Sequence, residues 1–231
     1  MAASDPWRAI LGRPGEGKQW DARGFFDSGL WEIDAVMRYA ESLHLPARRG
    51  AALDFGCGAG RLTLGLARHF DSVTGVDVAP AMLALAREHN NQPDRCRYVL
   101  NDTPDLARFP AGEFDLIYSN ITLQHLRPRL IHAYLAEFVR VLASGGLLLF
   151  HLPCRRLRPP LARLLPGNAY SHLSRLLWPV AHPGQPVIEM YGLPEETVVG
   201  RLERCGGRVL AREPQDSAGS DWESRRYAVT R

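Results

Sequence analysis

The chain has 231 residues, of which 45% are hydrophobic and 23% charged, a balance typical of a soluble globular domain. This composition excludes a disordered chain or a coiled coil, and the length suffices for one α/β domain with an added segment. The formal net charge of +3 is too small to indicate a nucleic-acid partner, so we expect none.

The four cysteines stand apart from one another, with no CxxC pair and no Cys/His spacing of a metal site. We therefore expect free thiols, no bound metal and the cytoplasm as the compartment. The first twenty residues lack the apolar segment of a signal peptide, and no apolar run is long enough to span a bilayer. Membrane contact is not expected.

Residues 1–46 predict an amino-terminal arm followed by a helix. Residues 1–30 are rich in Gly, Pro and aromatic side chains, which suits an arm that closes over a ligand or one that is anchored to the core. Apolar side chains at helical spacing then predict a helix over residues 31–45, and Pro46 ends it.

From residue 51 onward, short apolar runs alternate with amphipathic segments, which predicts βα units around a parallel sheet. The predicted strands are residues 51–55, 72–76, 97–100, 114–119, 146–152, 208–212 and 226–230. The predicted helices are residues 62–69, 81–89 and 128–142, and one that begins at Pro194. Residues 153–186, rich in Pro, Leu and Arg, predict a helical cap inserted after the fifth strand. We expect a single domain over residues 1–231.

A glycine-rich segment ends the first predicted strand and precedes a helix; residues 53–61 read Leu-Asp-Phe-Gly-Cys-Gly-Ala-Gly-Arg. The glycines let the main chain turn tightly and approach a ligand. The helix N–H groups suit a carboxylate, and Asp54 suits an ammonium group. The spacing is G-x-G-x-G, whereas dinucleotide enzymes use G-x-G-x-x-G, so it favours an adenosyl amino acid over a pyrophosphate.

Polar residues end the next two predicted strands. Asp77 is placed to bind two ribose hydroxyls, and Asn101 or Asp102 to receive an adenine amino group. Taken singly, these acids fit ordinary turn caps equally well. Their joint order at the carboxyl ends of neighbouring strands favours one shared site.

Together these motifs resemble the class I S-adenosylmethionine (SAM)-dependent methyltransferases over residues 51–152, and more loosely to the carboxyl end. Residues 54–60 match the glycine-rich first motif of the family, Asp77 its ribose-binding acid and Asp102 its adenine-side acid. Residues 114–120 match the fourth-strand motif, and residues 145–147 match the glycine turn before the fifth strand.

The resemblance implies a Rossmann-like, doubly wound α/β fold with a seven-stranded sheet, mostly parallel with its last strand antiparallel. It implies SAM as the cofactor. The cofactor-binding residues that we expect are Asp54, Gly56, Cys57, Gly58, Asp77, Val78, Met82, Asn101, Asp102 and Asn120.

Two residues are candidates for the acceptor side. His125 follows the fourth strand and suits a general base, although a capping or packing role is as compatible with its position. Tyr191 follows the expected cap and either orients the acceptor or packs in the core. No Asp or Glu lies between Glu137 and Glu189, whereas six arginines do. This stretch suits an anionic or carrier-bound acceptor, a solvated face or a peripheral membrane contact.

We expect a SAM-dependent methyltransferase that acts on a small-molecule acceptor, a biosynthetic intermediate. The alternatives are a lyase or cyclase that consumes SAM on the same fold, and a SAM-binding module without catalysis. A nucleic-acid methyltransferase is disfavoured, because residues 120–123 read Asn-Ile-Thr-Leu and lack the Asn/Asp-Pro-Pro-aromatic motif.

Overall fold

The computed structural model describes residues 21–157, 189–219 and 221–231. The strands are β1 (Ala51–Phe55), β2 (Ser72–Asp77), β3 (Cys96–Leu100), β4 (Phe114–Ser119), β5 (Leu142–Arg156), β6 (Arg208–Gln215) and β7 (Trp222–Thr230). The helices are α2 (Ala22–Ser42), α3 (Arg61–Leu66), α4 (Pro80–Glu88), the 3₁₀ helix η1 (Leu123–His125), α5 (Pro128–Val141) and α7 (Glu195–Arg204).

The seven strands form one sheet in the order β3-β2-β1-β4-β5-β7-β6. The strands β1 to β5 pair in parallel, and β7 runs antiparallel to both β5 and β6. The predicted sheet, with its antiparallel last strand, is confirmed. The chain reverses its direction of winding between β1 and β4, and in such sheets ligands bind outside the carboxyl ends of the strands at this point.

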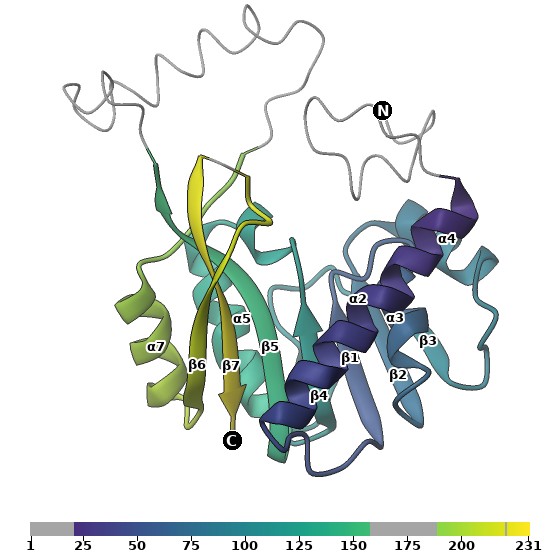
Figure 1. Ribbon diagram of the computed structural model, residues 1–231, viewed down its shortest axis with the longest axis horizontal. Helices are drawn as coiled ribbons and strands as arrows, with labels where there is room; N and C mark the ends of the chain where they lie inside the picture. Colours follow the sequence, from purple (N-terminus) through teal and green to yellow (C-terminus); the bar gives the residue numbers. More distant parts are fainter. Residues whose placement is uncertain (1–20, 158–188, 220) are drawn as a thin grey trace, which may run out of the picture.

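Helices cover both faces of the sheet (Figure 1). One layer holds α2, α3 and α4, whose apolar side chains share a cluster with Leu116, Tyr118 and Leu149. The other layer holds α5 and α7, which share a cluster with Ile117 and Leu148. Successive residues of a strand point to opposite faces, so β4 and β5 serve both clusters.

The helix α2 begins nine residues earlier than predicted, so the prediction of its start was wrong. Asp21 caps it, because its Oδ1 accepts the main-chain N–H of Gly24 at 2.7 Å. Phe25 and Gly29 are buried and extend the apolar face toward the amino terminus. A Cβ on Gly29 would lie 2.4 Å from the carbonyl oxygen of Arg61, so glycine permits close packing of α2 on α3. Residues 1–20 of the expected arm lie outside the described residues.

The strand β5 is longer than predicted, and it contains residues 153–156, which we had expected in a cap. Its ladder with β7 continues to the pair of Arg156 and Trp222. Main-chain pairing with β7 therefore holds a polar stretch that has no strand-like alternation of apolar residues. The rest of the expected cap, residues 158–186, lies outside the described residues. Among the described helices, none combines the length and the apolarity that crossing a membrane requires.

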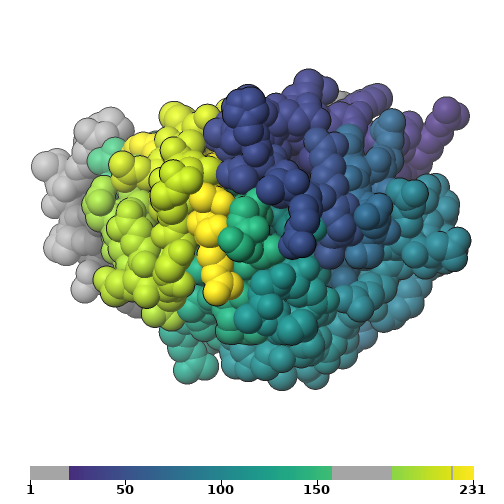
Figure 2. Space-filling model, turned by 90° about the horizontal axis from the view of Figure 1, so that it is seen from below, coloured from purple at the N-terminus to yellow at the C-terminus, as the bar shows by residue number. Residues whose placement is uncertain are grey.

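Segments far apart in the sequence meet at the amino-end edge of the parallel strands (Figure 2). The N–H of Ala47 donates to the carbonyl oxygen of Gly145, and the N–H of Gly145 donates to that of Arg231, both at 2.9 Å. A hollow of about 360 Å³ lined by Ser72 and Arg95 also lies at this side, where β2 and β3 begin. It is therefore distant from the carboxyl ends, where a ligand is expected.

Candidate functional site

The glycine loop after β1 has the geometry that its sequence predicts. Gly56, Gly58 and Gly60 have φ angles of 80°, 52° and 84°, in the left-handed region that side chains other than glycine rarely adopt. A Cβ on Gly56 would lie 2.2 Å from Oγ1 of Thr122, and one on Gly60 would lie 2.5 Å from Oη of Tyr98. The loop therefore needs glycine both for its conformation and for its close approach to its neighbours.

Asp77, at the end of β2, binds this loop directly. Its Oδ2 accepts the N–H of Gly58 at 2.9 Å, and its Oδ1 accepts the N–H of Ala79 at 2.8 Å. A carboxylate has about four acceptor positions, so it retains capacity for ribose hydroxyls.

Val78, the next residue, is 68% exposed, and Met82 on α4 is partly buried. An exposed valine beside the acid offers an apolar surface to an adenine ring.

Asp54 is the most buried acid of the predicted site, with 1% exposure. Its Oδ2 accepts the hydroxyl of Thr63 at 2.7 Å. Burial raises the pKa of this carboxyl to about 7; the Thr63 hydrogen bond and Arg61 oppose the shift, while Glu32 and Asp77 add to it. Asp54 therefore contributes a buried charge whose ionisation depends on a neighbouring cation.

The thiol of Cys57 is buried, which raises its pKa well above the ordinary range. This residue takes part in the loop through its main chain, whose N–H donates to the carbonyl oxygen of Val76 at 3.0 Å. The thiol itself remains protonated and unreactive.

At the end of β3, the two adenine-side candidates differ in their surroundings. The Nδ2 of Asn101 donates to the carbonyl oxygens of Thr103 and Asp105 and to Oη of Tyr134, each at 3.1 Å. Asn101 thus organises the loop that follows the strand, while its Oδ1 is buried and has no partner among the described residues. Asp102 is exposed and remains available for a ligand.

Sequence reasoning missed Glu32, which lies on α2 and connects three parts of the site. Its Oε1 accepts the hydroxyl of Tyr118 at 2.9 Å and Nδ2 of Asn120 at 2.8 Å. Its Oε2 pairs with Nη2 of Arg61 at 2.8 Å. The carboxylate therefore ties α2 to the end of β4 and to the start of α3. The sequence did carry one indication of a special role for Glu32. It lies four residues before Val36, so a helix over these residues puts an acid on its buried face.

The loop after β4 holds Asn120 at this junction in an unusual main-chain conformation. Ile121 has a φ of 56°, and a left-handed β-branched residue costs about 1–3 kcal/mol. The hydroxyl of Thr122 donates to the carbonyl oxygen of Asn120 at 3.1 Å, and the same side chain limits the space at Gly56. Loops after β1 and β4 are thus in direct contact, as a shared site requires.

The two predicted acceptor-side residues lie at one rim. His125 is exposed on η1, and its Nε2 lies 3.3 Å from Nε2 of Gln124. The N–H of Tyr191 donates to the carbonyl oxygen of Gln124 at 2.7 Å, and its hydroxyl donates to Glu189 at 2.6 Å. Partial desolvation lowers the pKa of His125, which favours the neutral imidazole that a general base requires.

Two arginines of the acid-free stretch have partners within the fold. Arg140 binds Glu137 and the carbonyl oxygens of Leu106 and Phe109. Arg155 pairs with Glu223 at 2.6 Å. Of the other four arginines, Arg156 is exposed at the end of β5, and Arg158, Arg163 and Arg175 lie outside the described residues, so the expectation of an anion-attracting surface stays a prediction.

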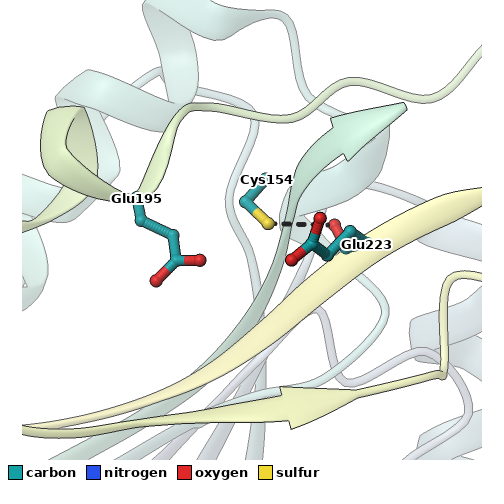
Figure 3. Close-up of side chains that lie close together, drawn as sticks. All are labelled: Cys154, Glu195 and Glu223. Atoms are coloured by element: carbon teal, nitrogen blue, oxygen red, sulfur yellow. Dashed lines mark hydrogen bonds between the residues drawn. The ribbon is translucent and has the colours of Figure 1, made fainter. Parts of the chain in front are cut away.

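Within the described residues, one group brings together side chains of the metal-ligand type: Cys154 on β5, Glu195 on α7 and Glu223 on β7 (Figure 3). Their ligand atoms lie within 4.8 Å of one another. Arg225, however, pairs with Glu195 at 2.9 Å and with Glu223 at 2.7 Å. Guanidinium groups already offset the carboxylate charges, so the cluster is explained as an ion-pair network that joins these three elements.

Comparisons with known proteins agree with this geometry. The family described as "Methyltransferase domain" matches residues 52–146. A demethylmenaquinone methyltransferase of Tropheryma whipplei is 32% identical over 185 residues, which cover 75% of this chain and 73% of that protein. A trans-aconitate 2-methyltransferase of Deinococcus radiodurans is 36% identical over 137 residues, which cover 53% of this chain and 49% of that protein. For several of the curated relatives that it matches, the chain spans only about half of their length.

The fold is similar to the crystal structure of magnesium protoporphyrin IX methyltransferase from Synechocystis with S-adenosylhomocysteine (SAH) bound. The TM-score is 0.63 at 17% identity, over 97% of this chain and 92% of that chain. This comparison shows that the overall fold is shared. The chain belongs to the family of SAM-dependent methyltransferases.

Proposed function

We propose that this protein binds SAM and transfers its methyl group to a small-molecule acceptor. The observation that carries the proposal is the bond between Asp77 and the N–H of Gly58. It joins the acid after β2 to the glycine loop after β1, at the point where the winding of the sheet reverses. An adenosyl group needs this combination of an acid for the ribose and a close main-chain approach.

The charges of the site support a cationic ligand. The carboxylates of Glu32 and Asp77 and the guanidinium of Arg61 all act electrostatically on the carboxyl group of Asp54, and Arg61 pairs with Glu32. SAM carries a sulfonium and an ammonium group against one carboxylate. These carboxylates stabilise such a ligand, because electrostatic interactions are stronger where water is partly excluded.

The residues of the chain have two further roles in methyl transfer: they position the acceptor, and they remove its proton. When bound, SAM supplies a methyl group attached to a positively charged sulfur. The sulfur keeps the electron pair of the carbon–sulfur bond when that bond breaks. Asn120 and Glu32 hold the end of β4 where the acceptor approaches. His125, exposed at the rim, takes the proton of an acceptor hydroxyl or amine and passes it to water. Tyr191 lies beside it and orients the acceptor.

The names of the relatives support a small molecule as the acceptor. By their names, the proteins of T. whipplei and D. radiodurans methylate demethylmenaquinone and trans-aconitate. We therefore propose a small biosynthetic intermediate as the acceptor. The free cysteines among the described residues support the cytoplasm as the proposed site of the reaction.

The experiment is a titration followed by product analysis. Calorimetry is expected to show binding of SAM and SAH and no binding of NAD; the reverse result would overturn the proposal. Incubation with methyl-labelled SAM and a metabolite extract should then give SAH and a labelled product, also in the presence of EDTA. Methylthioadenosine as the product would instead show lyase or cyclase chemistry. Tight binding without turnover would show a binding module.

A further inference from the structure

His151, on β5, is a buried imidazole for which the described part of the fold provides no partner. It is 3% exposed, and neither Nδ1 nor Nε2 has a hydrogen-bond partner. A buried polar group without a partner costs about 1–3 kcal/mol. Native proteins rarely retain such groups without a reason, and one reason is a ligand that completes the hydrogen bonds.

The register of the sheet locates His151 beside the proposed site. Phe150 pairs with Ser119, the last residue of β4, so His151 lies beside Asn120, just beyond the carboxyl end of β4, while β5 itself continues to Arg156. Leu149 belongs to the cluster on the α2 face, and His151, two residues later, points to the same face. Asn120 also faces α2, because its Nδ2 donates to Glu32. The imidazole therefore lies next to Asn120, one strand farther from the glycine loop.

The neighbour of His151 on the other side is Arg226 of β7, and it is already engaged. Its guanidinium stacks on the ring of Tyr39 at 4.1 Å and pairs with Glu213. The helix α2 crosses this face diagonally (Figure 1), touching Asn120 through Glu32 and Arg226 through Tyr39. The two contacts of α2 thus lie on either side of His151, and both involve groups other than the imidazole.

His151 differs chemically from His125. Burial lowers the pKa of His151 to about 4, so this imidazole stays neutral at physiological pH and is a weak base. A neutral imidazole offers one N–H donor and one nitrogen acceptor. It suits an uncharged polar group of a ligand, whereas His125 on the exposed rim suits proton exchange with water.

Building on the proposed function, we propose that His151 binds the acceptor, hydrogen-bonding a hydroxyl, carbonyl or amide group beside Asn120, where the methyl group is presented. It thereby selects acceptors with an uncharged polar group next to the methylated atom. Its partner is the acceptor itself, which explains why the fold supplies none among the residues described.

The test uses the acceptor that product analysis identifies, and it compares acceptor kinetics with SAH binding. We expect His151→Phe to bind SAH as the wild type does and to raise the ratio of the acceptor KM to the SAH Kd about tenfold, the change expected for one hydrogen bond. His151→Gln, which keeps a donor and an acceptor, should return most of this ratio to the wild-type value.

Tyr227→Phe is the matched control. Tyr227 is also fully buried, and its Oη also lacks a partner in the described chain, but it stacks on Phe150 on the opposite face of the sheet. This variant should leave the ratio unchanged. If His151→Phe does not fold, His151→Leu replaces it. A ratio in the folded apolar variant within twofold of the wild type overturns the role of His151, while SAH binding leaves the proposed function standing. Absence of SAH binding in the wild type overturns the proposed function.

Discussion

Asp77 holds the glycine loop in place, because its Oδ2 accepts the main-chain N–H of Gly58 at 2.9 Å. The acid lies at the end of β2, and the loop follows β1, its parallel neighbour. The proposed ribose contact and the conformation of the loop therefore depend on the same side chain. A change at Asp77 should affect both, and a change in the loop should affect ligand binding without altering Asp77.

Asp77→Ala should weaken SAM binding by about 1–3 kcal/mol, because it leaves the ribose hydroxyls and the N–H of Gly58 without their acceptor. Calorimetry with SAM measures the loss. Asp94→Ala, at an exposed position, is the control and should bind as the wild type does. Unchanged affinity in a folded Asp77→Ala protein would remove Asp77 from the site.

Gly56→Ala should destabilise the fold and abolish SAM binding. The substitution combines a positive φ with a Cβ that would lie 2.2 Å from Thr122. Gly206→Ala separates these causes, because Gly206 has a φ of 90° and open space around its Cβ position. Gly206→Ala should lower the free energy of unfolding by about 1 kcal/mol, the cost of the left-handed main-chain conformation alone, and it should bind SAM normally. Thermal unfolding and calorimetry report the two quantities. Equal effects of both substitutions would show that close approach at Gly56 is unimportant.

SAM affinity should rise with pH between about 5.5 and 8. The pKa of Asp54 is raised to about 7 in the free protein, so below that pH the carboxyl is mostly protonated. A cationic ligand favours the ionised form, and binding must then release this proton. The affinity should fall by up to about tenfold for each pH unit below 7. Calorimetry in buffers of different ionisation enthalpy measures the proton release.

Asp54→Asn is the control for this pH dependence. The α-amino group of the ligand titrates in the same way with both proteins, so the difference between them isolates Asp54. The variant should bind SAM more weakly at pH 8 and show a flatter profile. Identical profiles would mean that Asp54 is ionised, or protonated, throughout the range.

Glu32→Ala should lower both stability and SAM affinity. It leaves the side chain of Arg61, only 7% exposed, without its carboxylate partner. Because Glu32 itself is 27% exposed, we expect a loss of about 2 kcal/mol, less than the 3–5 kcal/mol typical of fully buried pairs. Urea unfolding measures it. Adding Arg61→Met should recover part of the stability but not the binding, since Asn120 stays untethered. Full recovery of SAM binding in the double variant would show that Glu32 serves only to balance Arg61.

His125→Ala should lower kcat by about 10²–10⁴, the usual contribution of a general base, and leave SAH affinity nearly unchanged. The wild-type rate should fall on the acid side of a pKa below the ordinary value for histidine, because only the neutral ring accepts a proton. The assay requires the acceptor identified by product analysis. Tyr191→Phe is the companion variant. A rate for His125→Ala within a few fold of the wild type would make His125 a packing residue.

The amino-acid sequence by itself determined the order of the elements and the main cofactor motif. Alternating apolar runs and amphipathic helices are local patterns, and they predicted β1 and β4 to the residue. The glycine spacing predicted a tight turn after β1, and the structure forms it with positive φ angles, which glycine adopts without strain. These features depend on neighbours in the chain, so they can be inferred without coordinates.

Only the tertiary structure decided which distant residues complete the site. Nothing in the local pattern around Glu32 indicates that it meets Asn120, 88 positions away. The contact arises because α2 crosses the sheet diagonally, a consequence of how the helices pack. The burial of His151 likewise depends on β4 and β7 lying on its two sides. The packing of distant segments determines the contact of Glu32 with Asn120 and the burial of His151. The spacing of residues along the chain therefore does not predict them.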